Sequence, residues 1–213
     1  MSSRTAVIFD LGGVVFPSPF EAFDRYDART GLDVGTTRAI IRRSSETGAW
    51  AALERGELTA EEFHAALEAE ALADGITISA ARIMATIAEE SGARPEMLTA
   101  IGRLRDAGLR VGALTNNWAD DRDRSTPAGL DELEIFHTIV ESARVGLRKP
   151  DPRIYELVLE RLGASAHESV FLDDLGINLK PARAMGMTTI KVSEPRAALT
   201  ELGAVLGLDL LGA

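Results

Sequence analysis

Residues 8–16 read IFDLGGVVF, an apolar stretch that one aspartate, Asp10, and two glycines interrupt. The run Ala6–Phe9 before the aspartate is short and continuously apolar, which is typical of a strand buried on both faces. Asp10 therefore ends a predicted buried strand, and the glycines that follow have no side chain with which to cover its carboxylate. The rest of the sequence indicates what this carboxylate is for.

Segments that predict strands alternate with segments that predict helices along most of the chain. The further predicted strands are residues 110–115, 138–140, 169–172 and 188–192. Predicted helices begin at Pro95, at Pro152 after the capping Asp151, near Leu179 and at Pro195. Because parallel strands need crossover connections, this alternation favours a doubly wound, parallel α/β sheet of the Rossmann-like kind.

Residues 17–90 break this alternation, since they carry several helical patterns and almost no strand signal. The segment Thr59–Glu62 has the form of a capping box, and Ser79 precedes apolar residues at helical spacing. We therefore predict a Rossmann-like core made of residues 1–16 and 91–213, with residues 17–90 inserted as a helical cap.

The composition is that of an ordinary globular protein, and it excludes several classes of function. Of the 213 residues, 46% are hydrophobic and 26% are charged. The chain has no cysteine, which excludes disulfides, thiolate metal sites and a cysteine nucleophile. The formal net charge of −10 argues against nucleic acid as a partner. The short apolar run near the N-terminus predicts neither a secretory signal nor a membrane span, so we expect a cytoplasmic protein.

Polar side chains follow three of the predicted buried strands at the point where each strand ends. These are Asp10, the pair Thr115-Asn116 and the pair Asp173-Asp174. Each alone would be an ordinary turn former or helix cap. The carboxyl ends of neighbouring parallel strands converge on one crevice, however, and ligands of open α/β sheets bind there. Lys149 precedes another predicted helix, and it is one of only three lysines in a chain that otherwise uses arginine. Together these features favour a functional site.

Four stretches, in this order, resemble the motifs of the haloacid dehalogenase-like hydrolase superfamily: IFDLGGVVF, ALTNNW, GLRKPDPRIY and VFLDDLGINLKPARAMGM. The narrower resemblance is to the N-terminal phosphatase domain of soluble epoxide hydrolase and to its stand-alone sugar-phosphatase relatives. Residues 48–63, GAWAALERGELTAEEF, are similar to the helical cap of that group. The resemblance runs from about Thr5 to the C-terminus and is weakest in the insertion.

This resemblance implies a magnesium-dependent phosphatase that hydrolyses small phosphate monoesters, the esters of a small phosphorylated metabolite, through an aspartyl-phosphate. The implied catalytic residues are Asp10 as the nucleophile, Thr115 and Lys149. The implied substrate-binding residues are Leu11, Gly12, Gly13, Asn116, Asn117 and Trp118. The implied ligands of Mg²⁺ are Asp10, the main-chain carbonyl of Gly12, Asp173 and Asp174, which are the hard oxygen donors that this ion prefers.

Gly12 departs from the pattern, because phosphatases of this superfamily carry an acid there that protonates the leaving oxygen and later activates water. A positioned acid or base contributes typically about 10²- to 10⁴-fold, a small part of the acceleration that phosphate monoester hydrolysis allows. We therefore expect an active enzyme that prefers good leaving groups and dephosphorylates slowly. Asp120 or Asp121 is a candidate for the missing base.

Two other functions stay open on the sequence. A metal-independent 2-haloacid dehalogenase would attack carbon with Asp10, and Lys149 and Tyr155 resemble positions that such enzymes use. The acids Asp173 and Asp174 argue against it, since a dehalogenase has uncharged polar residues there. A non-catalytic phosphate-binding or regulatory domain is the third reading, and the glycine at position 12 makes it plausible.

Overall fold

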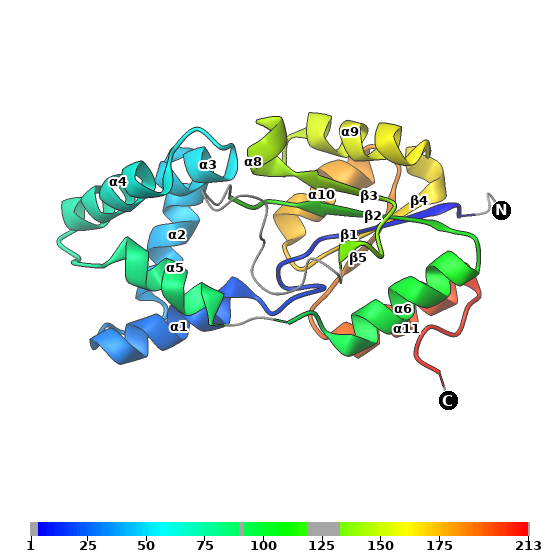
Figure 1. Ribbon diagram of the computed structural model, residues 1–213, viewed down its shortest axis with the longest axis horizontal. Coiled ribbons are helices and arrows are strands. Elements are labelled where there is room, and N and C mark those ends of the chain that lie inside the picture. Colours follow the sequence, from blue (N-terminus) through cyan, green and yellow to red (C-terminus); the bar gives the residue numbers. More distant parts are fainter. Residues whose placement is uncertain (1–3, 90–91, 119–132, 213) are drawn as a thin grey trace.

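The computed structural model describes residues 4–89, 92–118 and 133–212. Within these residues, five parallel strands form one sheet in the order β3-β2-β1-β4-β5 (Figure 1). The strands are β1 (Ala6–Phe9), β2 (Arg110–Thr115), β3 (Thr138–Glu141), β4 (Ser169–Asp173) and β5 (Thr188–Lys191). The α/β class and the parallel, doubly wound sheet that the alternation predicts are confirmed.

Helices cover both faces of the sheet. The helices α6 (Pro95–Asp106) and α11 (Pro195–Leu206) lie on one face, and α9 (Pro152–Leu162) and α10 (Gly176–Ala184) lie on the other (Figure 1). The side chains of β1 alternate between the two layers: Val7 and Phe9 pack with α6 and α11, whereas Ala6 and Ile8 pack with α9. All four are fully buried, which is why this strand reads as a continuous apolar run.

The register of pairing gathers the polar strand ends around β1. Phe9 lies opposite Ala113 of β2 on one side and Leu172 of β4 on the other. Asp10 is the next residue, and its main-chain N–H donates to the carbonyl of Leu172 at 2.8 Å. Asp10 therefore lies at the middle of the carboxyl edge of the sheet, between the ends of β2 and β4.

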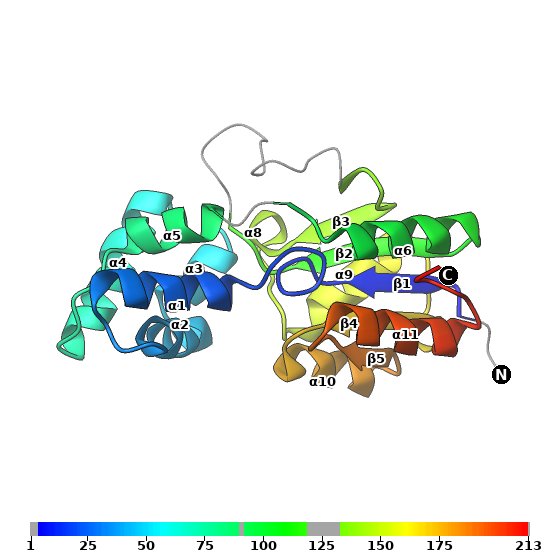
Figure 2. The ribbon, with the colours of Figure 1, turned by 90° about the horizontal axis from the view of Figure 1, so that it is seen from below.

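The helices α1–α5 pack together beside this edge of the sheet, and we call residues 19–88 the helical unit (Figures 1 and 2). Its helices are α1 (Pro19–Thr30), α2 (Thr36–Thr47), α3 (Ala49–Glu54), α4 (Ala60–Ala73) and α5 (Ala80–Ala88). They enclose an apolar core of their own, which includes Phe23, Trp50 and Phe63. The capping box at Thr59 is present, with Glu62 as its second member. The division of the chain at residues 17 and 90 stays a prediction.

Several element boundaries differ from the prediction by one to three residues. β3 continues through Glu141 and β4 through Asp173, whereas β5 ends at Lys191 instead of Val192. α10 begins at Gly176, three residues before Leu179, because Asp173 accepts a hydrogen bond from the N–H of Leu175 and so begins the turn earlier. The described chain also contains the short helix α8 (Ser142–Val145) and a 3₁₀ turn at Ala166–Glu168. None of the described helices is long and apolar enough to cross a membrane.

Candidate active site

Lys149 lies between two carboxylates at the carboxyl ends of neighbouring strands. Its Nζ is 2.8 Å from Oδ2 of Asp10 and 2.7 Å from Oδ2 of Asp173. The Lys149 side chain is 1% exposed and the Asp173 side chain is 0% exposed, so this ion pair is shielded from water. The interaction is strong because screening by solvent is weak there. It joins the residue after β1 to the last residue of β4 through a lysine from a third segment.

Asp173 is held in place by groups of α10 that the sequence did not single out. The Nδ2 of Asn178 donates to both carboxylate oxygens, at 3.0 and 3.1 Å, and the N–H of Leu175 donates to Oδ1 at 2.8 Å. The hydroxyl of Tyr155 donates to the carbonyl of Asn178 at 2.7 Å. Sequence reasoning missed Asn178; its place one turn into the helix that follows the paired acids was the available signal.

Asp174 approaches the glycine turn that follows β1. A Cβ placed on Gly13 would lie 2.6 Å from Cγ of Asp174 and closer still to its Oδ2. Gly13 also has a φ of +77°, a left-handed conformation that side chains disfavour. Glycine at this position therefore allows Asp174 to come close to the main chain that follows Asp10. At Gly12 a Cβ would meet only Cδ of Pro19 among the described residues, at 3.9 Å, which is an ordinary contact.

Asp10, Asp173 and Asp174 each offer an oxygen within 4.8 Å of the others, which is the spacing of a shared metal ion. Burial raises the pKa of Asp10 well above its usual range; Lys149 opposes this effect, whereas Asp173 and Asp174 add to it. Burial and the neighbouring Asp173 raise the pKa of Asp174 to about 6. Burial by itself lowers the pKa of Lys149, but the two carboxylates outweigh it and the pKa is raised. Three carboxyl groups thus lie beside one ammonium, an oxygen donor set that suits a hard divalent cation.

The end of β2 supplies the other side of the site. Thr115 is buried as the last residue of the strand. The next residue, Asn116, bonds to the main chain of Lys149 twice: its Oδ1 accepts from the N–H at 2.8 Å and its Nδ2 donates to the carbonyl at 3.1 Å. The Asn116 side chain therefore positions Lys149. Because this side chain is engaged, the predicted contact between Asn116 and the phosphate concerns its main-chain N–H. It stays a prediction.

The remaining predicted substrate-binding residues have contacts of their own. The N–H of Leu11 donates to Oδ1 of Asp10 at 2.7 Å. The Asn117 side chain donates to Glu141 at 2.8 Å and accepts from the N–H of Ala143, so it ties β2 to the start of α8. Trp118 is half-buried against Trp50 of the helical unit, with 5.9 Å between the ring centroids. Substrate contacts at these positions stay predictions, and Asp120 and Asp121 lie outside the described residues.

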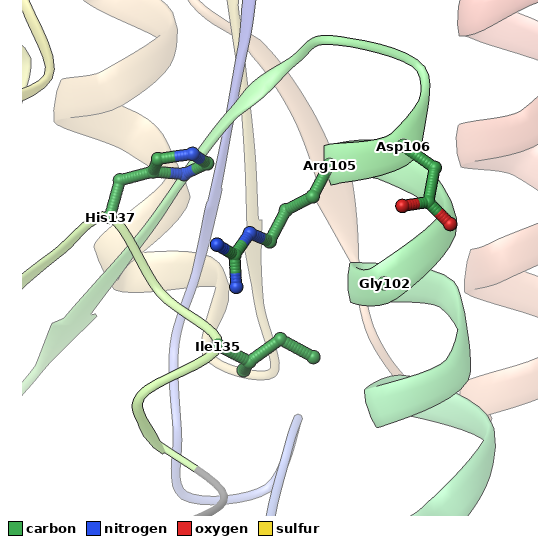
Figure 3. A pocket seen from close by; sticks show the side chains of 5 residues that line it. All are labelled: Gly102, Arg105, Asp106, Ile135 and His137. Atoms are coloured by element: carbon green, nitrogen blue, oxygen red, sulfur yellow. The ribbon is translucent and has the colours of Figure 1, made fainter.

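A pocket of about 430 Å³ lies away from these groups, between α6 and the segment that leads into β3 (Figure 3). Gly102, Arg105 and Asp106 of α6 line it together with Ile135 and His137. The N–H of His137 donates to Val111 near the start of β2, so the pocket lies toward the opposite end of the strands from Asp10. It contains none of the predicted site residues.

Comparison with known proteins agrees with the motifs. A model of the haloacid dehalogenase-like hydrolases matches residues 5–186. Bifunctional epoxide hydrolase 2 of Sus scrofa is 35% identical over 218 residues, which are 97% of this chain and 39% of that protein. The chain thus spans about two fifths of the length of that relative. Sesquiterpene phosphatase astK of Aspergillus oryzae is 33% identical over 207 residues, which are 95% of this chain and 96% of that protein.

A solved structure shares the fold. It is a HAD family enzyme from Bacteroides thetaiotaomicron in complex with magnesium and inorganic phosphate, with a TM-score of 0.62 and 22% sequence identity. The match covers 92% of this chain and 99% of that chain. At this level of identity the likeness concerns the fold.

Replacing Lys149 with methionine should destabilise the protein by about 3–5 kcal/mol, because Asp10 and Asp173 are left as buried, unpaired charges. In such a variant the folded-state pKa of Asp10, which burial already raises, rises further because Lys149 no longer opposes it, so the folded state binds protons more readily than the unfolded state. The loss should therefore be larger at pH 8 than at pH 5. Urea unfolding with a chelator present measures this loss of unfolding free energy.

Lys180→Met, at an exposed lysine, is the control and should change the free energy of unfolding by less than about 0.5 kcal/mol. Equal losses in the two variants would contradict the burial argument.

Replacing Gly13 with alanine should displace Asp174 and weaken any divalent cation bound by the acids. The left-handed φ alone should lower the free energy of unfolding by about 1–2 kcal/mol. The specific result is that Mg²⁺ raises the melting temperature of the unmodified chain and raises that of the Gly13 variant much less. Gly12→Ala adds the same methyl group where space is open, so its response to Mg²⁺ should stay close to that of the unmodified chain. Identical responses in both alanine variants would show that the Gly13–Asp174 approach is unimportant.

Proposed function

This chain belongs to the haloacid dehalogenase-like hydrolases, and within that family we propose that it is a magnesium-dependent phosphatase of small phosphate monoesters. The observation that carries the proposal is the buried Lys149 between Asp10 and Asp173, with Asp174 beside them. This arrangement provides a nucleophile, a cation for the phosphate and a group of acids suited to a divalent metal. The phosphatase name of a relative that matches almost end to end supports the same activity.

The proposed reaction has two steps at Asp10. A carboxylate oxygen of Asp10 attacks phosphorus, the new oxygen–phosphorus bond forms, and the bond from phosphorus to the ester oxygen breaks. The leaving alkoxide or phenoxide carries the electron pair of the broken bond and takes a proton from water when its basicity requires one. Water then attacks the aspartyl-phosphate, releases inorganic phosphate and restores the Asp10 carboxylate.

The other residues bind and orient the phosphate. The ammonium of Lys149 stabilises the negative charge of the phosphate oxygens while it holds Asp10 in line. The Thr115 hydroxyl and the main-chain N–H groups near it bind the same oxygens at the end of β2. Asp10, Asp173, Asp174 and the carbonyl of Gly12 would hold Mg²⁺, which when bound neutralises charge on the transferring phosphoryl group. The excess of acids over ammonium groups in the buried cluster is what fits this ion.

Gly12 decides which substrates such an enzyme handles well. No carboxylate stands at this position to protonate the leaving oxygen, so aryl, acyl or anomeric phosphates are the favoured class of substrate. None of the described residues crowds this position, because a Cβ on Gly12 would make only an ordinary contact with Cδ of Pro19 at 3.9 Å. The helical unit beside the carboxyl edge of the sheet would act as a cap that excludes water and selects the leaving group.

A haloacid dehalogenase is the alternative, with attack on carbon in place of phosphorus. Two observations disfavour it. The acids Asp173 and Asp174 would be superfluous in a reaction that needs no metal. The hydroxyl of Tyr155, a residue that a dehalogenase would use, is buried and donates to the carbonyl of Asn178.

Turnover of p-nitrophenyl phosphate tests the function. We expect hydrolysis that requires Mg²⁺, stops with a chelator and falls at least about 1,000-fold in Asp10→Asn, since the amide is a poor nucleophile. Chloride release from 2-chloropropionate is measured beside it. Chloride release without metal would establish the dehalogenase instead, and the absence of both reactions would favour a non-catalytic phosphate-binding domain.

A panel of phosphate esters tests the role of Gly12. Aryl phosphates should turn over at least about tenfold faster than simple alkyl phosphates. An alkoxide is a poor leaving group when no acid protonates it, whereas a phenoxide leaves without a proton. Gly12→Asp should narrow the ratio of aryl to alkyl rates by raising the alkyl rate, and a Cβ at position 12 meets no described atom closer than 3.9 Å. Equal aryl and alkyl rates in the unmodified chain would overturn the proposed preference.

A further inference from the structure

Glu54 is a buried carboxylate that the proposed chemistry does not use. It is the last residue of α3 in the helical unit, is 7% exposed and faces the core. Its Oε1 accepts from the indole N–H of Trp50 at 2.9 Å. Its Oε2 accepts from Arg148, at 2.7 Å from Nε and 2.5 Å from one terminal nitrogen, and from Nδ2 of Asn116 at 3.4 Å. Its partners therefore lie on both the helical unit and the core.

Arg148 makes the same connection from the core side. It directly precedes Lys149 in the chain, and its guanidinium bonds to Glu54 of α3 and also donates to the carbonyl of Ser45 in α2 at 2.7 Å. The ion pair is largely shielded from solvent, with the Arg148 side chain 17% and the Glu54 side chain 9% exposed. Charge-assisted hydrogen bonds of this kind are short and directional, so they fix α2 and α3 relative to the loop that carries Lys149.

Asn116 is the second route from Glu54 to Lys149. Its Oδ1 accepts from the N–H of Lys149 and its Nδ2 donates both to the carbonyl of Lys149 and to Glu54. The residue that Glu54 touches is therefore the one that clamps the main chain of Lys149 on both sides. Since Nζ of Lys149 already lies 2.7–2.8 Å from two carboxylates, a small displacement of its main chain would disturb both ion pairs.

The close approach of the segment after α3 to helix α8 is an independent observation at the same contact between the helical unit and the core. Gly56, two residues after Glu54, has a φ of +69°. A Cβ there would lie 3.2 Å from the carbonyl carbon of Ala143 in α8 and closer still to its oxygen. The chain after α3 thus approaches the core main chain as closely as only glycine permits, which leaves little freedom in where Glu54 sits.

We propose that Glu54 is a positioning residue, through which the helical unit sets the places of Arg148 and Asn116 and so of the Lys149 ammonium. The inference rests on the proposed phosphatase function and deepens it, since it makes the rate of phosphoryl transfer depend on how α3 sits on the core. In this role Glu54 does not contact the substrate. A carboxylate is required because only an acceptor with two oxygens can bond to Trp50, Arg148 and Asn116 together.

The test compares Glu54→Gln with Glu70→Gln. Glu70 is the matched control because its Oε1 also accepts from α3, at the N–H of Ala49, yet that contact lies within the helical unit. We expect Glu54→Gln to lower kcat for p-nitrophenyl phosphate about 10- to 100-fold, with a smaller rise in KM, because the amide has no charge to hold Arg148 and has only one oxygen to accept from both Arg148 and Trp50. Glu70→Gln should keep kcat within about twofold.

Two further variants distinguish positioning from stability. Glu54→Asp retains the charge and should recover part of the lost kcat. The double variant Glu54→Gln with Arg148→Met should be no slower than the slower of its two single variants, because both act through one contact. The proposal is overturned if Glu54→Gln retains kcat within twofold, if its loss equals that of Glu70→Gln, or if the loss matches only the unfolded fraction measured by circular dichroism.

Failure of the proposed function would look different. If the unmodified chain hydrolyses no phosphate ester, binding of orthophosphate with Mg²⁺ present, measured by calorimetry, replaces turnover as the readout. Glu54→Gln should then weaken that binding at least about threefold and Glu70→Gln should leave it unchanged. Equal binding in the two variants, or no binding by the unmodified chain, would overturn the positioning role.

Discussion

The site depends on one buried cation, the ammonium of Lys149, held between the carboxylates of Asp10 and Asp173. Either acid alone would be costly to bury at the carboxyl edge of the sheet, beside the buried strands β1 and β4. The lysine makes their burial possible and fixes their separation. In the proposed function the same ammonium would bind a phosphate oxygen. Three carboxyl groups surround it in a chain with a net charge of −10, so a divalent cation held by these acids would supply the remaining positive charge that an anionic substrate needs.

Small residues determine how closely other groups approach this cation. Gly13 leaves room for Asp174, whereas a Cβ at Gly12 would meet only Cδ of Pro19, at 3.9 Å, among the described residues. Gly56 brings the helical unit against α8 in the same way. At Gly13 and at Gly56 a side chain would thus hold two segments apart. The functional groups that result come from the ends of β1, β2 and β4, from the loop before α9 and from α3 of the helical unit.

The sequence predicted the sheet and much of the candidate site for physical reasons that are local. The runs Ala6–Phe9 and Arg110–Thr115 are apolar over the length of one strand, so the strands were recognisable without their neighbours. Asp10, Thr115 and Asp173 follow from the rule that parallel strands end together. The sequence predicts that α10 begins near Leu179, whereas it begins at Gly176, just after the hydrogen bond that Asp173 accepts from the N–H of Leu175.

By itself, the sequence determined the α/β class and the order of the motifs, and its resemblance to the haloacid dehalogenase-like hydrolases supplied the candidate residues for phosphoryl transfer. The class and the order depend on periodicity, residue type and chain order, which are properties of a linear chain. Only the tertiary structure decided which groups touch. That Asn178 holds Asp173, that the Asn116 side chain clamps Lys149, and that Glu54 reaches Arg148 across 94 positions of sequence are consequences of packing. Long-range contacts of this kind arise from the register of the strands and from where the helices pack, and no local sequence pattern determines either.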